Sequence, residues 1–354
     1  MTVRLEVFRF GFGSETQSDP EASSPGNVRF VPGAETSLPQ TGARVLNQLV
    51  ADSEGDLLAF VDDSAADRPT NFETARGLLE QQPQSDLLMS LPGGSGWLGY
   101  IWEHFPPWLA SLVIRPDPEG IVFIRRSAFA QHGPFADVSA PLWDWLIRAV
   151  HAGGSVIVDA DPAAEQSLPT MPTELPELVP GAPGRKWNWL RDHLVCPQEI
   201  APRVASAADA VAVQAGLLQL HDSLDESHQL SQSVQGAGRH RAGDYWHAIM
   251  HRREPDYSNA KYWFRRVGKH PLFEELGRRA NDILEGAGLS ELSEWQECLE
   301  LTTGWNPIAF VDLCQKCEQA DDASLSEAAR AIQLTEMMLL LEQTYRDGFE
   351  EALV

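Results

Sequence analysis

The sequence predicts two kinds of fold in one chain: an α/β domain over residues 1–160 and an all-helical domain over residues 185–354. In the first region, short strand-type apolar runs alternate with helix-type periodicity, the pattern of strands joined by helices. Six prolines then break both patterns in a segment that we interpret as a linker, 161–184. Beyond that segment, apolar residues recur at helical spacing only.

In the first domain, the residues of most interest stand where two expected strands end. The expected elements are a strand through Val3, Leu5 and Val7, a helix over Gly42–Ala51, strands over Asp56–Val61 and Gly120–Ile124, and a helix over Pro141–His151. The strand Asp56–Val61 runs into Asp62 and Asp63, and Gly120–Ile124 leads into Arg125 and Arg126. Carboxylates at the carboxyl end of a strand lie where open α/β sheets bind ligands. We therefore expect a ligand site at this edge.

In the second domain, two histidines share one apolar stripe. Leu217, His221, Leu224 and His228 recur at helical spacing and predict a single helix whose buried side carries both imidazoles. The last helix is expected to begin at Ser324, because Glu327 follows at capping-box spacing.

Composition limits the classes of function. The chain has 354 residues, 43% of them hydrophobic, and a net charge of −24, which argues against nonspecific nucleic-acid binding because phosphate contacts dominate that affinity. No apolar run is long enough for a membrane span or a signal peptide. Four cysteines are too few for a disulfide scaffold and favour a reducing compartment, so we expect a cytoplasmic protein. Nothing in the sequence indicates an oligomeric state.

The segment 221–271 departs from this acidic background. It concentrates histidine, arginine and aromatic residues, and between Arg239 and His270 eight Lys or Arg residues face only three Asp or Glu residues. Such a segment suits an anionic ligand, a metal ion or an acidic surface of the same molecule.

Five segments of the first domain carry a family resemblance: Arg4–Thr16, Gly42–Asn47, Gly55–Asp63, Gly120–Phe135 and Pro141–Ala149. They resemble family 2 glycosyltransferases, which have a nucleotide-diphospho-sugar transferase fold. In that family an acidic pair holds a divalent cation, Mn²⁺ or Mg²⁺, against the diphosphate of the sugar nucleotide. The resemblance places Asp62 and Asp63 at that metal and cofactor site, with Arg125 and Arg126 on the acceptor side.

The same comparison implies a partial and degenerate domain. The first strand of the family's fold, expected ahead of Arg4, is missing, and Ser64 stands at the third acidic position of the metal motif. Leu142 stands where the family carries its catalytic base, and leucine takes no proton. Asp144, two residues on, is expected to be a helix-surface residue.

A second candidate site is a metal site in the helical domain. His247 and His251 are four residues apart on one expected helix face, with His221 or His228 as a third ligand and Asp222 or Asp225 as a further one. Two imidazoles one turn apart suit zinc or iron. The alternative is that these are hydrogen-bonded core histidines.

A third candidate is anion recognition by five basic residues: Arg252, Arg253, Lys261, Arg265 and Arg266. Guanidinium groups bind phosphate or carboxylate through paired hydrogen bonds. The alternative is that they pair with acidic residues of the same protein. The segment also resembles a family of uncharacterised bacterial and fungal helical proteins, which implies no known chemistry.

Two functions follow as hypotheses. The first is a glycosyltransferase-like protein that transfers sugar from a nucleotide-sugar donor but has degenerate catalytic positions. The second is a noncatalytic binding protein whose helical domain recognises a small anionic ligand or a protein partner.

Overall fold

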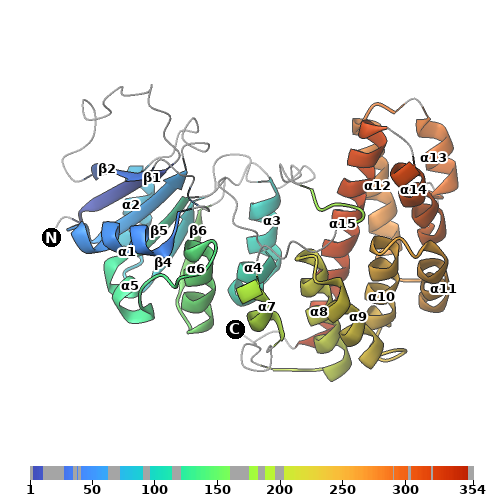
Figure 1. The fold of residues 1–354 in the computed structure, drawn as a ribbon, viewed down its shortest axis with the longest axis horizontal. Coiled ribbons are helices and arrows are strands. Elements are labelled where there is room, and N and C mark those ends of the chain that lie inside the picture. The colour runs from blue at the N-terminus through green and yellow to red at the C-terminus, as the bar shows by residue number, and fades with distance from the viewer. Residues whose placement is uncertain are drawn as a thin grey trace. The chain divides into compact units, whose positions relative to one another are not determined.

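A computed structural model of the chain describes residues 3–10, 28–34, 38, 41–62, 72–90, 96–113, 121–159, 175–181, 188–195, 203–289, 291–301, 304–319 and 322–349. The chain divides into two compact units, unit 1 (Met1–Thr170) and unit 2 (Met171–Val354) (Figure 1). Of the sequence-predicted residues, Asp63 and Ser64 lie outside the described ranges, as do the prolines 162, 169, 172 and 183. No helix in the described part is both long and apolar enough to span a membrane.

Unit 1 contains a mixed, largely parallel sheet. Its six described strands are β1 (Leu5–Phe10), β2 (Val28–Ala34), β3 (Leu57–Asp62), β4 (Leu87–Ser90), β5 (Ile121–Arg125) and β6 (Val156–Asp159). They lie in the order β2-β1-β3-β5-β4-β6, and only β5 runs antiparallel to its neighbours. The inner strands read as almost continuous apolar sequence because both faces of the sheet are covered.

The described helices of unit 1 are α1 (Ala43–Asp52), α2 (Phe72–Gln81), α3 (Gly96–His104), α4 (Pro107–Val113), α5 (Arg126–His132) and α6 (Pro141–His151). Leu5 and Val7 join residues of α2 in one core cluster. On the opposite face, Phe60 lies edge-on to Phe135 with ring centroids 5.6 Å apart, and Phe135 packs on Phe129 of α5. Alternate strand residues therefore serve the two faces, as the pleat requires.

Strand β1, whose residues were expected to follow a missing first strand, lies inside the sheet. This strand is hydrogen-bonded on both sides, to β2 and to β3, with Leu5 opposite Leu57 and Phe10 opposite Asp62. It is therefore an inner strand, and no place for another strand remains between β1 and β3. Asp144 was expected on the surface of its helix, but it is buried and pairs with Arg148 at 2.8 Å.

The regular secondary structure of unit 2 is helical in its described residues, apart from one isolated bridge between Val204 and Phe349. Its helices are α7 (Asn188–Val195), α8 (Ala207–Leu220), α9 (Leu224–Ser233), α10 (Ala242–Arg253), α11 (Tyr257–Val267), α12 (Phe273–Gly286), α13 (Leu292–Cys298), α14 (Pro307–Gln319) and α15 (Ala323–Gly348). In Figure 1 the red helix α15 runs through the bundle beside α12 and α8, and both are its packing partners.

Two sequence predictions in unit 2 were wrong in detail. The helix expected through Leu217 and His228 is broken, because α8 ends at Leu220 and α9 begins at Leu224, with Asp222 between them at a φ of 59°. The last helix begins earlier than Ser324, since the Asp322 side chain accepts a hydrogen bond from the Leu325 amide at 3.0 Å and is the N-cap.

Part of the proline-rich segment packs on unit 2. The backbone carbonyl of Glu177 accepts a hydrogen bond from the Gln333 side chain at 3.1 Å, and the carbonyl of Pro176 accepts one from Arg330 at 3.1 Å. The described residues 175–181 are therefore anchored to α15 by their main chain.

Gly216 of α8 allows the close approach of α10. A Cβ atom built on Gly216 would lie 2.4 Å from the Trp246 ring, whereas one on Gly286 would meet nothing within 4 Å. We predict that Gly216→Ala lowers the free energy of unfolding by about 1–3 kcal/mol through overpacking. The matched variant Gly286→Ala should be neutral or slightly stabilising. Urea unfolding of both variants checks this, and equal effects would contradict the packing described.

Candidate metal centre

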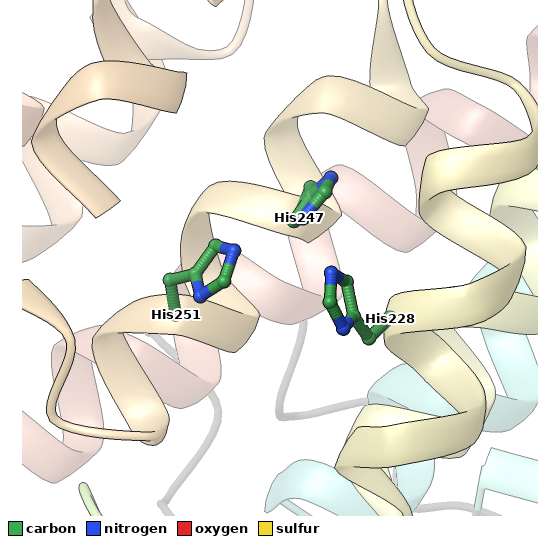
Figure 2. A group of neighbouring side chains, drawn as sticks. All are labelled: His228, His247 and His251. Atoms are coloured by element: carbon green, nitrogen blue, oxygen red, sulfur yellow. The ribbon is translucent and has the colours of Figure 1, made fainter. Parts of the chain in front are cut away.

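Three histidines of unit 2 form a cluster. His247 and His251 lie one turn apart on α10, and His228 faces them from α9 (Figure 2). One ring nitrogen of each lies within 4.8 Å of one from the other two. His247 is 1% exposed and His251 is 6% exposed, so two of the three rings are buried.

Helix α10 imposes this arrangement because it is buried along its whole length. All of its residues are buried, including those that are polar. The four-residue spacing places both imidazoles on the side that faces α9. Trp263 of α11 stacks on His247 with ring centroids 4.0 Å apart and an interplanar angle of 21°, which fixes that ring.

Several imidazole nitrogens of the cluster lack a hydrogen-bond partner among the described residues. Both nitrogens of His247 and Nδ1 of His251 are buried without a hydrogen-bond partner among the described residues. Nε2 of His251 lies 3.0 Å from the Asn259 side-chain amide, and Oε2 of Glu254 lies 3.6 Å from its Nδ1. Buried polar atoms are normally hydrogen-bonded. The cluster is therefore an exception that needs an explanation.

Burial in the cluster holds the imidazoles of His247 and His251 in the neutral form. Burial, together with smaller effects of the neighbouring His251 and His228, lowers the pKa of His247 to about 3. Burial and then His228 lower the pKa of His251 to about 4, against a smaller opposite effect of Asp256. Neutral imidazole is the form that binds a metal.

The spacing of the rings is compatible with a metal ion after a small closure. A tetrahedral ion about 2.1 Å from each nitrogen requires nitrogens about 3.4 Å apart. The ring nitrogens of the three histidines lie up to 4.8 Å apart, which is a wider spacing. Binding would therefore draw the rings together by modest side-chain rotation.

The structure shows which of the further ligands expected from the sequence lie at the cluster. It brings His228 to the pair, while His221 lies in the turn after α8 and outside the cluster. Asp222 pairs with Arg253 at 2.5 Å. Sequence reasoning missed Glu254 and Asn259, although Glu254 follows His251 at helical spacing.

Arg252 and Arg253 are internal structural residues. Arg252 is 1% exposed, pairs with Glu336 of α15 at 2.5 Å, and lies 4.5 Å from the centre of the Phe310 ring. Tyr245 donates a hydrogen bond to the same carboxylate at 2.9 Å. The side chain of Arg253 is fully buried and donates to the Gln219 carbonyl at 2.5 Å as well as to Asp222.

The other three basic residues lie on α11. Lys261 forms an ion pair with Asp312, and Arg266 lies over the Trp263 ring, 5.1 Å from its centre and 3.9 Å from the Asp244 carboxylate. Arg265 is exposed and lines a pocket.

The residues singled out in unit 1 lie at opposite ends of the sheet. Asp62 is the last residue of β3, at the carboxyl end of the parallel strands. Arg125 is paired with Leu57, at their amino end, because β5 is antiparallel. Arg125 donates to the Ser85 carbonyl at 2.5 Å, and Arg126 donates to the Gly55 carbonyl at 2.6 Å. The two arginines thus bind main-chain carbonyls away from Asp62.

Comparisons with known proteins give only distant structural likeness. No protein-family model and no curated protein matches the chain. Among solved structures, the chain is similar to a mannosyltransferase of Pyrobaculum calidifontis in complex with GDP-Man and Mn²⁺, at 13% identity and a TM-score of 0.35, covering 95% of this chain and 88% of that one. It is also similar to S. aureus TarS 1–349, at 13% identity and a TM-score of 0.29, covering 95% and 92%. Both values are too low to establish a common fold.

The neutral, buried imidazoles predict an acid-sensitive unit 2. Because the folded-state pKa values of His247 and His251 are about 3 and about 4, the unfolded chain takes up protons first as the pH falls below about 6.5. Their contribution to stability is complete above that pH and is lost on acidification. From pH 7 to pH 5 we expect a fall of about 1–2 kcal/mol per imidazole.

Urea unfolding in the presence of a chelator measures this fall. The variant His247→Gln should lose less stability between pH 7 and pH 5 than the wild type, while both respond alike between pH 7 and pH 8. Identical acid responses would show that His247 is not protonated on unfolding as described.

Proposed function

We propose that this protein binds a divalent transition-metal ion through His228, His247 and His251. The observation that carries the proposal is the buried, unpartnered state of both ring nitrogens of His247 inside a cluster of three imidazoles. A bound ion would supply the partner that the protein does not.

The chemistry of the donors indicates the class of metal. Imidazole nitrogens suit Zn²⁺, Fe²⁺, Ni²⁺ and Cu²⁺, whereas Mg²⁺ and Ca²⁺ prefer oxygen. Three protein nitrogens leave a fourth position for water, for an exogenous ligand or for the nearby Glu254 carboxylate. An ion in such a site supplies Lewis acidity at that position. The Asn259 side-chain amide lies 3.0 Å from Nε2 of His251. With the amide turned so that its oxygen accepts from Nε2–H, it would leave Nδ1 unprotonated for the ion.

Zinc titration of the full chain tests the proposal. We expect one ion per chain and a loss of affinity of about a hundredfold or more in His247→Ala or His251→Ala, because a ligand is removed. The pKa values of about 3 and about 4 also predict that binding persists at pH 5.5, where exposed histidine pairs are largely protonated.

His270→Ala is the matched control. His270 is also a buried histidine whose pKa is lowered to about 3, by burial and then by His240, but it lies outside the cluster. Equal zinc affinity in the wild type and in His247→Ala, or an equal loss in His270→Ala, would reject the site.

A second proposed function, for unit 1, is nucleotide-sugar binding of the glycosyltransferase type. It is supported by the place of Asp62. The chain passes from β1 to β2 on one side, while β3 lies on the other side of β1, so the strand order reverses between β1 and β3. Ligands of open α/β sheets bind outside the carboxyl strand ends at such a point. Asp62 and Asp63 would hold Mn²⁺ or Mg²⁺ there, with the diphosphate of a nucleotide sugar.

A thermal-shift panel of sugar nucleotides with Mn²⁺ tests this second function. A ligand that binds only the folded state raises Tm, by an amount set by its concentration relative to Kd. We expect a shift that needs both the nucleotide sugar and Mn²⁺, and that disappears in Asp62→Asn. Asp52→Asn, an exposed carboxylate at the end of α1, should retain it. If no sugar nucleotide raises Tm beyond Mn²⁺ alone, this function is excluded.

A further inference from the structure

We infer that a pocket between α11 and α14 binds a small molecule that carries a phosphate or carboxylate group, through Arg265 and Lys261. The pocket contains none of the three clustered histidines and no residue of unit 1. Its volume of about 470 Å³ lies within the range typical of small-molecule sites.

The periodicity of α11 builds one wall of the pocket. Tyr257, Lys261 and Arg265 are spaced four residues apart and share one face, and Gln315 of α14 lies opposite. Asn259 and Trp263, which contact the histidine cluster, are offset by two residues, or about 200° around the helix. The pocket and the metal centre are therefore on opposite sides of α11.

Arg265 differs from Arg252 and Arg253 because its guanidinium has no protein partner among the described residues. It has no ion pair or hydrogen bond within the described part of the chain, and it is exposed at the pocket. Arg252 and Arg253, by contrast, are buried with carboxylate partners. A free guanidinium fork beside a polar pocket suits an oxyanion, to which it donates two parallel hydrogen bonds.

Lys261 supplies a second positive group one turn away. Its ammonium is held by Asp312 of α14, and its side chain is 23% exposed. An ammonium has three donors, so the contact with Asp312 leaves donors for a ligand. One turn of helix is about 6 Å, which lets one phosphate or carboxylate contact both Lys261 and Arg265.

Tyr257, Ser258 and Asp256 line the other end of the pocket. Burial raises the pKa of Tyr257 to about 12, with Glu318 adding to the shift, so its hydroxyl stays protonated. That hydroxyl is buried without a hydrogen-bond partner among the described residues, and the Ser258 hydroxyl donates to Asp256 at 3.2 Å. Asp256 lines the same end and caps α11, accepting from the Asn259 amide at 3.2 Å. Its charge disfavours an anion there and favours hydroxyl or amine groups.

The charges along the pocket therefore indicate which chemical group of the ligand lies at each end. The anionic group lies between Lys261 and Arg265, and hydroxyl or ammonium groups lie toward Asp256 and Ser258. Amino-sugar phosphates have this arrangement, while inorganic phosphate satisfies only the anionic end.

Isothermal titration calorimetry of the full chain in chelator-treated buffer tests the inference, with inorganic phosphate and glucosamine 6-phosphate as probes. We expect saturable binding of one molecule per chain, tighter for glucosamine 6-phosphate. Arg265→Gln should weaken binding about tenfold or more, because a charge-assisted hydrogen bond is lost. Arg265→Lys should fall between the two.

Two controls make the result decisive. Lys269→Gln removes the same charge from an exposed residue outside the pocket and should bind as the wild type does. His247→Ala should also bind normally, since the metal centre is separate. Absence of saturable heat with both probes, or equal weakening by Arg265→Gln and Lys269→Gln, would overturn the inference. Binding of phosphate without preference for the sugar phosphate would overturn the assignment of the Asp256 end.

Discussion

The complete burial of α10 is the constraint on which the rest of unit 2 depends. This helix carries two histidines and two arginines in its last two turns, and no side of it faces water. Removing a charged or polar group from water is costly unless a partner compensates. Each of these side chains must therefore find a partner inside the protein, and the surrounding helices supply most of them.

The arginines and the histidines meet this requirement differently. Glu336 on α15 neutralises Arg252, and Asp222, in the turn after α8, neutralises Arg253. Breaking a buried pair such as Arg252–Glu336 typically costs about 3–5 kcal/mol. This pair, together with the hydrogen bonds of the buried Arg253 guanidinium, therefore holds α10 in a fixed rotation against α8 and α15. That rotation directs His247 and His251 at His228. No carboxylate or carbonyl among the described residues pairs with His247. This difference is the reason that we propose the histidines, and not the arginines, as metal ligands.

Much of the architecture could be predicted from local sequence, whereas the partners could not. The apolar run before Asp62 indicated its strand, and the spacing of His247 and His251 indicated a shared helix face. The choice between His221 and His228 depended on a break at Asp222, where a positive φ ends α8. The helical spacing of apolar residues in the sequence continues across such a break and therefore does not reveal it. Arg252 and Arg265 could not be told apart, because only the packing of α15 buries the first and leaves the second at the surface.

The direction of strand β5 could not be predicted from the sequence either. Arg125 and Asp62 both follow apolar runs and were expected at one site, yet the antiparallel course of β5 places them at opposite ends of the sheet. Local sequence specifies that a strand forms, and long-range pairing decides which way it runs. The basic residues of 221–271 are likewise divided by packing. Arg252 neutralises a carboxylate inside the helical bundle, whereas Arg265 is exposed and lines a pocket.

X-ray absorption spectroscopy of the zinc-loaded full chain is the most direct measurement of the central claim. The account predicts an inner shell containing imidazole nitrogens at about 2.0–2.1 Å, with the multiple-scattering signature of three histidine rings. One ring should be lost in His228→Ala. A shell made only of oxygen, or a spectrum unchanged by that substitution, would contradict it.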